Sequence, residues 1–175
     1  GAPRGERHYI LYNPKVINRE LGLRRSEIEE SCELAQTFLA NNIQTLVFAR
    51  SRVDTEVLLS KLQSAPLLNG HRISGYRGGY LPAERREIEE GLRTGEIRGV
   101  VATNALELGI DIGQLEAVIL CGYPGTVTST WQRFGRAGRR AGTSIAVLVA
   151  SSSPLDQYIV NNPEYFFGAP VESGL

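Results

Sequence analysis

Four short runs of apolar residues recur along the chain and constrain its fold more than any other feature. Each run is rich in β-branched residues and is bounded by turn residues, a pattern typical of strands buried on both faces. The runs are Thr45 to Ala49, Val100 to Ala102, Ala117 to Cys121 and Ile145 to Ala150. Segments with helical periodicity separate them, which gives the strand–helix–strand order of a parallel sheet. We therefore expect an α/β fold in which helices flank a parallel β-sheet on both faces.

Several helices are expected between and after these strands. The first begins at Ser26, because Ser26 and Glu29 have the spacing of a capping box. Its expected buried residues are Ile28, Cys32, Ala35 and Leu39. The next two helices are predicted over Asp54 to Gln63, with Val57, Leu58 and Leu62 buried, and over Ala83 to Arg93 after Pro82, separated by a loop at Ser74 to Tyr80.

The two ends of the sequence add three further elements. Tyr9 to Tyr12 is predicted to be a strand at the edge of the sheet, closed by Asn13-Pro14. Leu155 to Val160 is predicted to be a short helix that ends before Pro163. The aromatic residues Tyr165 to Phe167 are expected to dock onto another part of the protein.

The length fits one domain with a substantial core. The chain has 175 residues, of which 42% are hydrophobic. We expect residues 1–175 to form one domain, with residues 151–175 as a C-terminal extension leading to further domains. Because the sequence starts at Gly1 and contains no Met, we also expect it to be part of a longer protein.

The composition limits how the protein could bind nucleic acid, a metal ion or a membrane. The 19 Lys and Arg residues equal the 19 Asp and Glu residues, so nucleic-acid binding would have to come from local clusters of charge. Cys32 and Cys121 lie far apart, without other metal ligands nearby in sequence, so no metal site is expected. No run is long and apolar enough to cross a bilayer. We expect a cytoplasmic protein with no membrane partner, associated with the nucleoid if bacterial.

The arginine-rich segment from Trp131 to Arg140 is the most informative stretch. A helix that starts near Ser129 would place Gln132, Arg136 and Arg139 on one stripe, with Trp131, Phe134 and Ala137 roughly opposite. Gly135 and Gly138 weaken a helix, so we expect them to permit close approach of another part of the backbone.

Two forked cations on one stripe suit a polyanion such as the terminal phosphate of a nucleotide. In phosphoryl transfer, an arginine from outside the phosphate-binding loop stabilises the charge that develops on the phosphate oxygens. That role fits Arg136 and Arg139. A solvated basic helix face accounts for the spacing equally well, and spacing alone does not separate the two.

The segment Thr103 to Asp111 follows the strand Val100 to Ala102. Ligands of parallel α/β sheets gather at the carboxyl ends of the strands, where Thr103 and Asn104 would lie. Their hydroxyl, amide and backbone N–H groups can hold a phosphate. Capping of a short helix at Ala105 explains the same residues at least as well on chemistry alone.

The sequence Gln132-Arg133-Phe134-Gly135-Arg136-Ala137-Gly138-Arg139 matches motif VI of superfamily 2 helicases, Q/H-R-x-G-R-x-G-R. The resemblance implies a RecA-like C-terminal motor domain, of the type found in DEAD/DEAH-box helicases. By this resemblance, Arg136 and Arg139 reach the γ-phosphate of ATP bound by the first RecA-like domain. Gln132 would couple nucleotide contact to the rest of the motor.

Two further segments resemble motifs of the same family. Thr103 to Asp111 looks like motif V, T-x-x-x-x-x-G-x-D, which implies that Thr103, with Asn104 beside it, contacts the nucleic-acid backbone. In the same motif, Gly109 and Asp111 would border ATP, with Asp111 a candidate for the ribose hydroxyls.

Leu46 to Arg52 resembles motif IV, which implies backbone contacts from Ser51 and Arg52. Capping by Ser51 and solvation of Arg52 are equally good explanations without the family. Gly78 and Gly79 occupy the place of the next family loop, where Arg77-Gly78-Gly79 replaces the usual His-Gly, and a backbone contact there is weakly implied. Tyr76 and Tyr80 could stack on bases, although tyrosines in loops more often pack against the protein.

A closer resemblance covers residues 7 to about 168. Tyr76 to Pro82 and Ala102 to Asp111, together with Asn13-Pro14 and Leu21 to Ser26, are similar to the mitomycin-repair-type DNA helicases, bacterial and fungal relatives of the RecQ-four-like enzymes. The resemblance implies a 3′-to-5′ DNA translocase that acts in DNA repair on single-stranded or tailed DNA. Members of the family also have a zinc-binding C-terminal region, which this sequence lacks.

A complete motor needs a phosphate-binding loop, G-x-x-x-x-G-K-[ST], and an acidic Mg²⁺ ligand. Neither pattern occurs in this sequence. ATP and Mg²⁺ would therefore be held mainly by a first RecA-like domain in the same polypeptide, and the chain alone should not hydrolyse ATP.

Other functions compatible with the sequence are an RNA helicase, a duplex translocase, and a non-catalytic nucleic-acid or protein-binding module on a degenerate motor fold. Intact Arg136 and Arg139 argue against the module. A dinucleotide-binding domain is disfavoured, because no G-x-G-x-x-G follows a strand.

Overall fold

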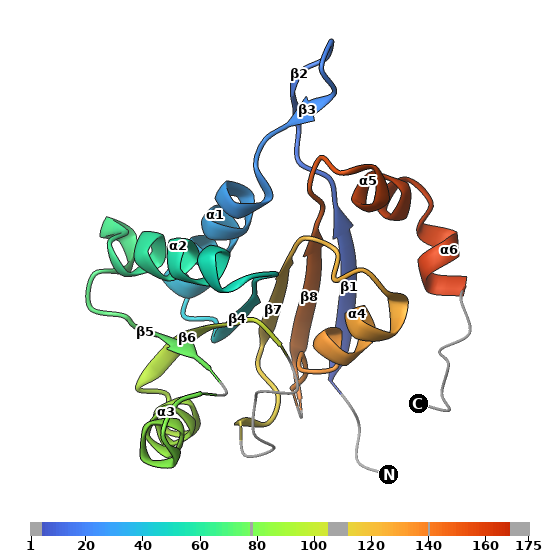
Figure 1. Ribbon diagram of the computed structural model, residues 1–175. Helices are drawn as coiled ribbons and strands as arrows, with labels where there is room; N and C mark the ends of the chain where they lie inside the picture. The colour runs from blue at the N-terminus through green and yellow to red at the C-terminus, as the bar shows by residue number, and fades with distance from the viewer. Residues whose placement is uncertain (1–4, 78, 105–111, 140, 169–175) are drawn as a thin grey trace.

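The computed structural model describes residues 5–77, 79–104, 112–139 and 141–168. Its main feature is a six-stranded sheet with the order β1-β8-β7-β4-β6-β5, in which every neighbouring pair is parallel (Figure 1). The strands are β1 (Glu6–Tyr12), β4 (Thr45–Phe48), β5 (Arg72–Tyr76), β6 (Ile97–Ala102), β7 (Ala117–Cys121) and β8 (Thr143–Val149).

Helices cover both faces of this sheet, as predicted. The elements outside the sheet are the β2–β3 hairpin (Val16–Asn18 and Leu23–Arg24), the short turn η1 (Pro66–Leu68), and the helices α1 (Glu27–Ala40), α2 (Arg52–Gln63), α3 (Pro82–Thr94), α4 (Val127–Phe134), α5 (Pro154–Asn161) and α6 (Pro163–Gly168). Alternate residues of a strand point to opposite faces, so β4 sends Val47 toward α1 and α2, and Leu46 and Phe48 toward α3 and α4. The α/β prediction is confirmed.

The predicted caps and helix faces are largely present. Ser26 is the N-cap of α1, where its Oγ accepts a hydrogen bond from the N–H of Ile28 at 3.1 Å. Only this half of the predicted capping box is formed, because the carboxylate of Glu29 instead lies 3.6 Å from the guanidinium of Arg25. Cys32, Ala35 and Leu39 are buried, as expected, and Ile28 is partly buried.

Two expectations about this half of the chain are wrong. Val57 is exposed, because α2 turns Leu58 and Leu62 inward and Val57 lies one helical step away from Leu58. The predicted loop at Ser74 to Tyr80 begins inside β5. Gly75 allows a close approach there: a Cβ atom at this position would lie 3.2 Å from Leu59 of α2, so the glycine serves packing instead of a turn.

The edge strand and α5 match their predictions, whereas the aromatic residues after Pro163 lie on a further helix, α6, that was not predicted. β1 lies at one edge of the sheet, parallel to β8. Phe166 of α6 is fully buried, and its ring stacks on that of Trp131 at 5.1 Å, whereas Phe167 is half exposed. The aromatic residues of the last helix therefore dock onto α4, mainly through Phe166.

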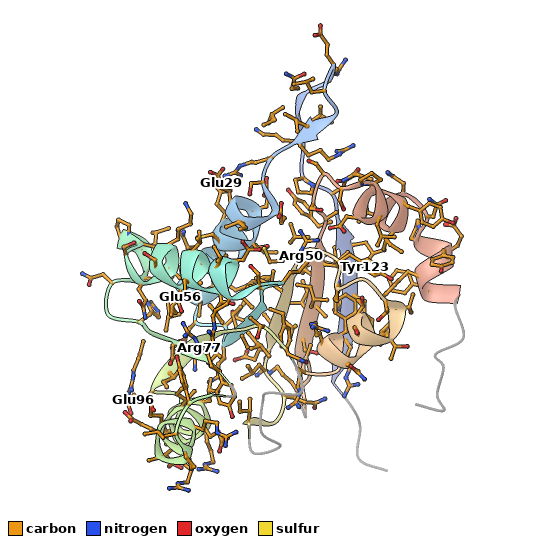
Figure 2. All side chains as sticks on the ribbon, viewed as in Figure 1. Glu29, Arg50, Glu56, Arg77, Glu96 and Tyr123 are labelled. Atoms are coloured by element: carbon orange, nitrogen blue, oxygen red, sulfur yellow. The ribbon has the colours of Figure 1, made fainter. Side chains whose placement is uncertain are left out.

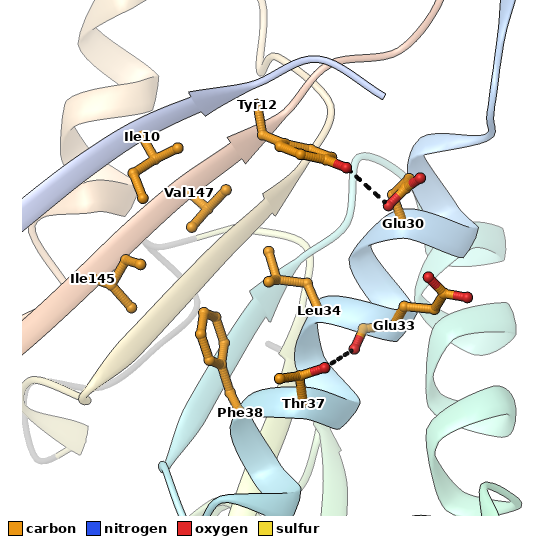
Figure 3. A pocket seen from close by; sticks show the side chains of 9 residues that line it. All are labelled: Ile10, Tyr12, Glu30, Glu33, Leu34, Thr37, Phe38, Ile145 and Val147. Atoms are coloured by element: carbon orange, nitrogen blue, oxygen red, sulfur yellow. Dashed lines mark hydrogen bonds between the residues drawn. The ribbon is translucent and has the colours of Figure 1, made fainter. Parts of the chain in front are cut away.

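One part of the sheet surface is left open beside α1. A groove of about 360 Å³ lies between α1, the edge strand β1 and its neighbour β8, as Figure 3 shows. Its residues are Ile10, Tyr12, Glu30, Glu33, Leu34, Thr37, Phe38, Ile145 and Val147. Tyr12 donates a hydrogen bond to Glu30 across the end of the groove at 3.4 Å, which ties the edge strand to α1.

Candidate functional site

A polar cavity of about 240 Å³ lies at the carboxyl ends of three neighbouring strands. β4, β6 and β5 end there at Phe48, Ala102 and Tyr76. We call this space the strand-end cavity; its residues are Arg50, Ser51, Arg52, Thr55, Tyr76, Arg77, Gly79 and Thr103. The fold thus brings together four residues that the sequence predicted as backbone contacts from three separate segments: Ser51, Arg52, Gly79 and Thr103.

The loop after β4 serves both the cavity and the next helix. Ser51 is the N-cap of α2, where its Oγ accepts a hydrogen bond from the N–H of Asp54 at 3.0 Å. The capping role that sequence chemistry allowed is confirmed, and the same hydroxyl also lines the cavity. Arg52 is exposed and forms no ion pair with any carboxylate that the structure describes.

Arg50 was missed as a cavity residue, and the structure holds its guanidinium firmly. Nη2 lies 3.4 Å from Glu27 Oε1, and Nη1 lies 3.7 Å from Asp156 Oδ1. Gly122 passes directly beneath: a Cβ atom there would lie 2.4 Å from Nε of Arg50. Figure 2 labels Arg50 at the upper ends of the central strands. The glycine that follows β7 is a sequence signal that could have indicated this close approach.

Asp156 anchors the far side of Arg50. Its carboxylate is 2% exposed and accepts hydrogen bonds from the backbone N–H groups of Ser151 at 2.8 Å and Tyr123 at 3.1 Å. These bonds join α5 to the loop that follows β7. The carboxylate therefore fixes two loops and one cavity arginine at once.

The third strand contributes Arg77 and Tyr76. Arg77 is ion-paired with Glu56 of α2, and Figure 2 shows the two side chains directed toward one another. Tyr76 is 1% exposed, so its ring packs in the core and does not offer a stacking surface. A Cβ atom at Gly79 would meet no atom within 4 Å, so the backbone there is open to a ligand.

Thr103 is connected to the arginine segment through Arg133. The guanidinium of Arg133 donates to the carbonyl oxygens of Ser129 at 3.1 Å and Thr103 at 3.4 Å, and it lies over the ring of Phe48 at 5.6 Å. Burial lowers the pKa of Arg133. A half-buried cation that spans two motifs is a link that sequence spacing did not predict.

The arginine segment does not form the predicted helical stripe. α4 ends at Phe134, a turn follows at Gly135 and Arg136, and Ala137 then forms an isolated parallel bridge with Leu115. The N–H of Leu115 donates to Arg136 O at 2.8 Å, and the N–H of Gly138 donates to Leu115 O at 2.9 Å. Gln132 is therefore on α4, whereas Arg136 and Arg139 lie beyond its end.

Gly138 lies close to a neighbouring side chain. A Cβ atom at Gly138 would lie 2.6 Å from Gln114 Oε1, so only glycine fits without a shift of that side chain. The expected close approach was of backbone, whereas the atoms that Gly138 makes room for belong to the Gln114 side chain. Phe134 and Ala137 are buried and Trp131 is partly buried, as expected, although they do not share one helix face.

Arg139 points to a carboxylate on the neighbouring loop. Its Nη1 lies 3.5 Å from Glu116 Oε2, and 46% of the Arg139 side chain is exposed. Glu116 also accepts from the backbone N–H of Gln44 at 3.4 Å. Arg136 is half-buried. Arg139 is thus an accessible cation that is already matched to an anion.

The remaining predicted site residues are Gly78, Gly109 and Asp111, which lie outside the described residues, as does the alternative helix at Ala105. Asn104 is described and half-buried beside Thr103. Within the described ranges, no group of three His, Cys, Asp or Glu side chains is placed to hold a metal ion. No helix in those ranges is both long and apolar enough to span a bilayer.

Comparison with protein families gives a match over the region that contains these segments. The model of the helicase conserved C-terminal domain matches residues 27–141, more than half of the chain. The chain belongs to this helicase domain family. The match includes the strand-end cavity, Arg133 and the arginine segment.

Individual relatives of this helicase domain are larger proteins. The uncharacterized ATP-dependent helicase YprA of Bacillus subtilis is 57% identical over 175 residues, which are 99% of this chain and 23% of YprA. The ATP-dependent helicase HRQ1 of Saccharomyces cerevisiae is 38% identical over 169 residues, 94% of this chain and 16% of HRQ1. The helicase domain thus spans less than a quarter of either relative.

Solved structures agree with both the family and the fold. The DUF1998 helicase MrfA bound to DNA has a TM-score of 0.89 at 57% identity, over 96% of this chain and 23% of that chain. A structure of MrfA with DNA and AMPPNP gives a TM-score of 0.88. The C-terminal domain of the DEAD-box protein Dbp5, at 20% identity and a TM-score of 0.66, is similar in fold. The RecA-like α/β fold is therefore shown.

Proposed function

We propose that this chain is the second motor domain of an ATP-dependent DNA helicase that moves 3′ to 5′ along one strand in DNA repair. The strand-end cavity carries the proposal, because hydroxyl groups and guanidiniums from three strand ends surround one small polar space. Such a set of donors suits the phosphate oxygens of a nucleic-acid backbone. The DNA-bound structures of MrfA support the choice of DNA.

The strand would lie across the carboxyl ends of β4, β6 and β5. Arg52 supplies a cation, and Ser51 and Thr103 supply hydroxyl groups on the same cavity. Gly78, Gly79 and Asn104 would add backbone and amide contacts. Phosphate contacts position a strand without reading its sequence, so binding should tolerate many base sequences.

The arginine segment would face the nucleotide. Arg136 and Arg139 would contact the γ-phosphate of ATP held by a first RecA-like domain in the same polypeptide, where Mg²⁺ would also be held. Arg139 Nη1 lies 3.5 Å from Glu116 Oε2, and the Arg139 side chain is half exposed. Arg139 would therefore leave the Glu116 carboxylate and bind the phosphate oxygens instead. Gly109 and Asp111 would border the same nucleotide.

Arg133 would couple the two sites. It joins α4, which bears Gln132, to the carbonyl of Thr103, so a shift of the arginine segment moves the strand contact with it. A half-buried guanidinium that keeps its charge is costly to separate from its hydrogen-bond partners.

The test uses the full-length protein. We expect ATP turnover to rise with single-stranded DNA and not with matched RNA, and we expect 3′-tailed duplexes to be unwound and 5′-tailed duplexes to persist. Thr103→Ala should weaken DNA stimulation while nucleotide binding stays nearly intact. Thr37→Ala, an exposed threonine on α1, serves as the control. Stimulation by RNA alone, or DNA binding without turnover, would overturn the proposal.

The 175-residue chain by itself should show no Mg²⁺-dependent ATP turnover. Its sequence contains no phosphate-binding loop, so the arginines have no bound nucleotide to act on. A phosphate-release assay checks this expectation, and turnover by the purified chain would contradict it.

A further inference from the structure

Two arginines of the strand-end cavity are held by carboxylates, but not equally firmly. Arg50 lies between Glu27 and Asp156, whose side chains are 20% and 2% exposed. Arg77 is ion-paired with Glu56 of α2, whose side chain is 50% exposed (Figure 2). Water can solvate an exposed carboxylate after its cation leaves, whereas a buried carboxylate would be left uncompensated. Of these two arginines, Arg77 is therefore the one that can be released.

The backbone around Arg77 places its side chain at the cavity. Arg77 directly follows β5, at the sheet edge where β4 and β6 also end. Its carbonyl oxygen accepts a hydrogen bond from the N–H of Tyr80 at 3.2 Å, and the preceding side chain, Tyr76, is buried in the core. The Arg77 side chain itself is 34% exposed. Its root is therefore fixed, while the guanidinium at its end is accessible to a ligand.

A phosphate beside Arg77 would also meet donors from the other strand ends. Ser51 and Thr103 present hydroxyl groups to the same cavity, and α2 begins there at Arg52. The N-terminal end of a helix carries partial positive charge, which favours an anion. Glu56 lies about one turn further along α2, outside the set of cavity residues. A phosphate can therefore bind Arg77 together with these donors, in a place that the Glu56 carboxylate does not reach.

We propose that Glu56 is a positioning residue that holds Arg77 while no strand is bound, and that a phosphate of the DNA backbone then replaces the Glu56 carboxylate. The inference rests on the proposed function, since the phosphate belongs to a strand in the strand-end cavity. Arg77 thereby joins Arg52 as a cation that contacts the strand. Because the ion pair has to open first, Glu56 weakens strand binding. An exposed ion pair contributes little, so this reduction in affinity is about twofold to fivefold.

The test measures how tightly the full-length protein binds a single-stranded DNA oligonucleotide of mixed sequence. ATP turnover is followed as the oligonucleotide is titrated. Glu56→Gln should lower the DNA concentration for half-maximal stimulation by about twofold to fivefold, and turnover at saturating DNA should stay unchanged. Glu90→Gln is the matched control, because Glu90 is 59% exposed, is ion-paired with Arg93 on α3 and is not a cavity residue. It should leave both quantities unchanged.

Arg77→Gln should act in the opposite direction. The DNA concentration for half-maximal stimulation should rise roughly tenfold, because a hydrogen bond between charged groups is lost. Fluorescence anisotropy of the labelled oligonucleotide at several salt concentrations gives a second readout. The slope of log affinity against log salt should fall in magnitude by about 0.7, the value for one phosphate contact on a single strand. Adding Glu56→Gln to Arg77→Gln should have no further effect, because the carboxylate acts through Arg77.

Three results would overturn the inference and leave the proposed function standing. The first is an unchanged or raised half-maximal DNA concentration in Glu56→Gln. The second is a gain in affinity that persists in the Arg77→Gln background, because Glu56 would then act as a general negative charge. The third is a change in the half-maximal concentration of ATP instead of DNA, because the displaced anion would then belong to the nucleotide. Absence of DNA-stimulated turnover in the wild-type protein would instead refute the proposed function.

Discussion

Replacing the buried carboxylate of Asp156 should destabilise the domain strongly. Asp156→Ala leaves the N–H groups of Ser151 and Tyr123 without their acceptor, and both bonds are buried. Each unsatisfied buried donor costs about 1–3 kcal/mol, so we expect the free energy of unfolding to fall by about 2–6 kcal/mol. Arg50 also loses its contact at 3.7 Å, which adds to the loss. Urea unfolding followed by circular dichroism measures the change.

A surface carboxylate in the next helix provides the control for this variant. Glu164 of α6 is exposed, so Glu164→Ala should change the free energy of unfolding by less than about 0.5 kcal/mol. The reasoning would be refuted if Asp156→Ala cost no more than the control, because the two backbone donors would then have found other acceptors. A fall in the unfolding midpoint with an unchanged denaturant slope would identify a change in stability and not in the denatured state.

Two further predictions follow from the core. Phe166→Ala should lower the free energy of unfolding by about 3–5 kcal/mol, because the ring is fully buried against Trp131. Phe167→Ala should lower it much less, since Phe167 is half exposed. Equal losses for the two variants in urea unfolding would contradict this. Burial raises the pKa of the Cys121 thiol to about 12. In a Cys32→Ser variant, which leaves Cys121 as the one thiol, the native protein should therefore resist a thiol reagent at pH 8, and the unfolded chain should react quickly. Rapid labelling of the native variant would contradict this.

The sheet was largely predictable because its central strands are buried on both faces. β4, β7 and β8 read as continuous apolar runs, and each lies where its run predicted. β5 was missed because Gly75 and Ser74 resemble turn residues, although packing against α2 is what requires the glycine. The β2–β3 hairpin was missed because strands of two or three exposed residues leave no hydrophobic pattern.

The sequence predicted several residues of the candidate site, but not the hydrogen bonds and ion pairs that join them. Ser51 and Thr103 follow strands, and parallel strands bring their carboxyl ends to one edge. Helical periodicity wrongly extended α4 through Arg139, because it cannot anticipate that the backbone pairs with Leu115. The partnerships of Arg133 and Arg50 join segments far apart in the sequence, so no local pattern carries them.

The roles of the arginine segment remain the central claim, and ATP turnover tests it most directly. In the full-length protein at saturating DNA, Arg139→Ala should lower turnover by about 10³-fold, as loss of an arginine finger does. Stability should change little, because the ion pair with Glu116 is partly exposed. Arg86→Ala, at an exposed arginine on α3, should leave turnover unchanged. Turnover at the wild-type rate in Arg139→Ala would contradict the account.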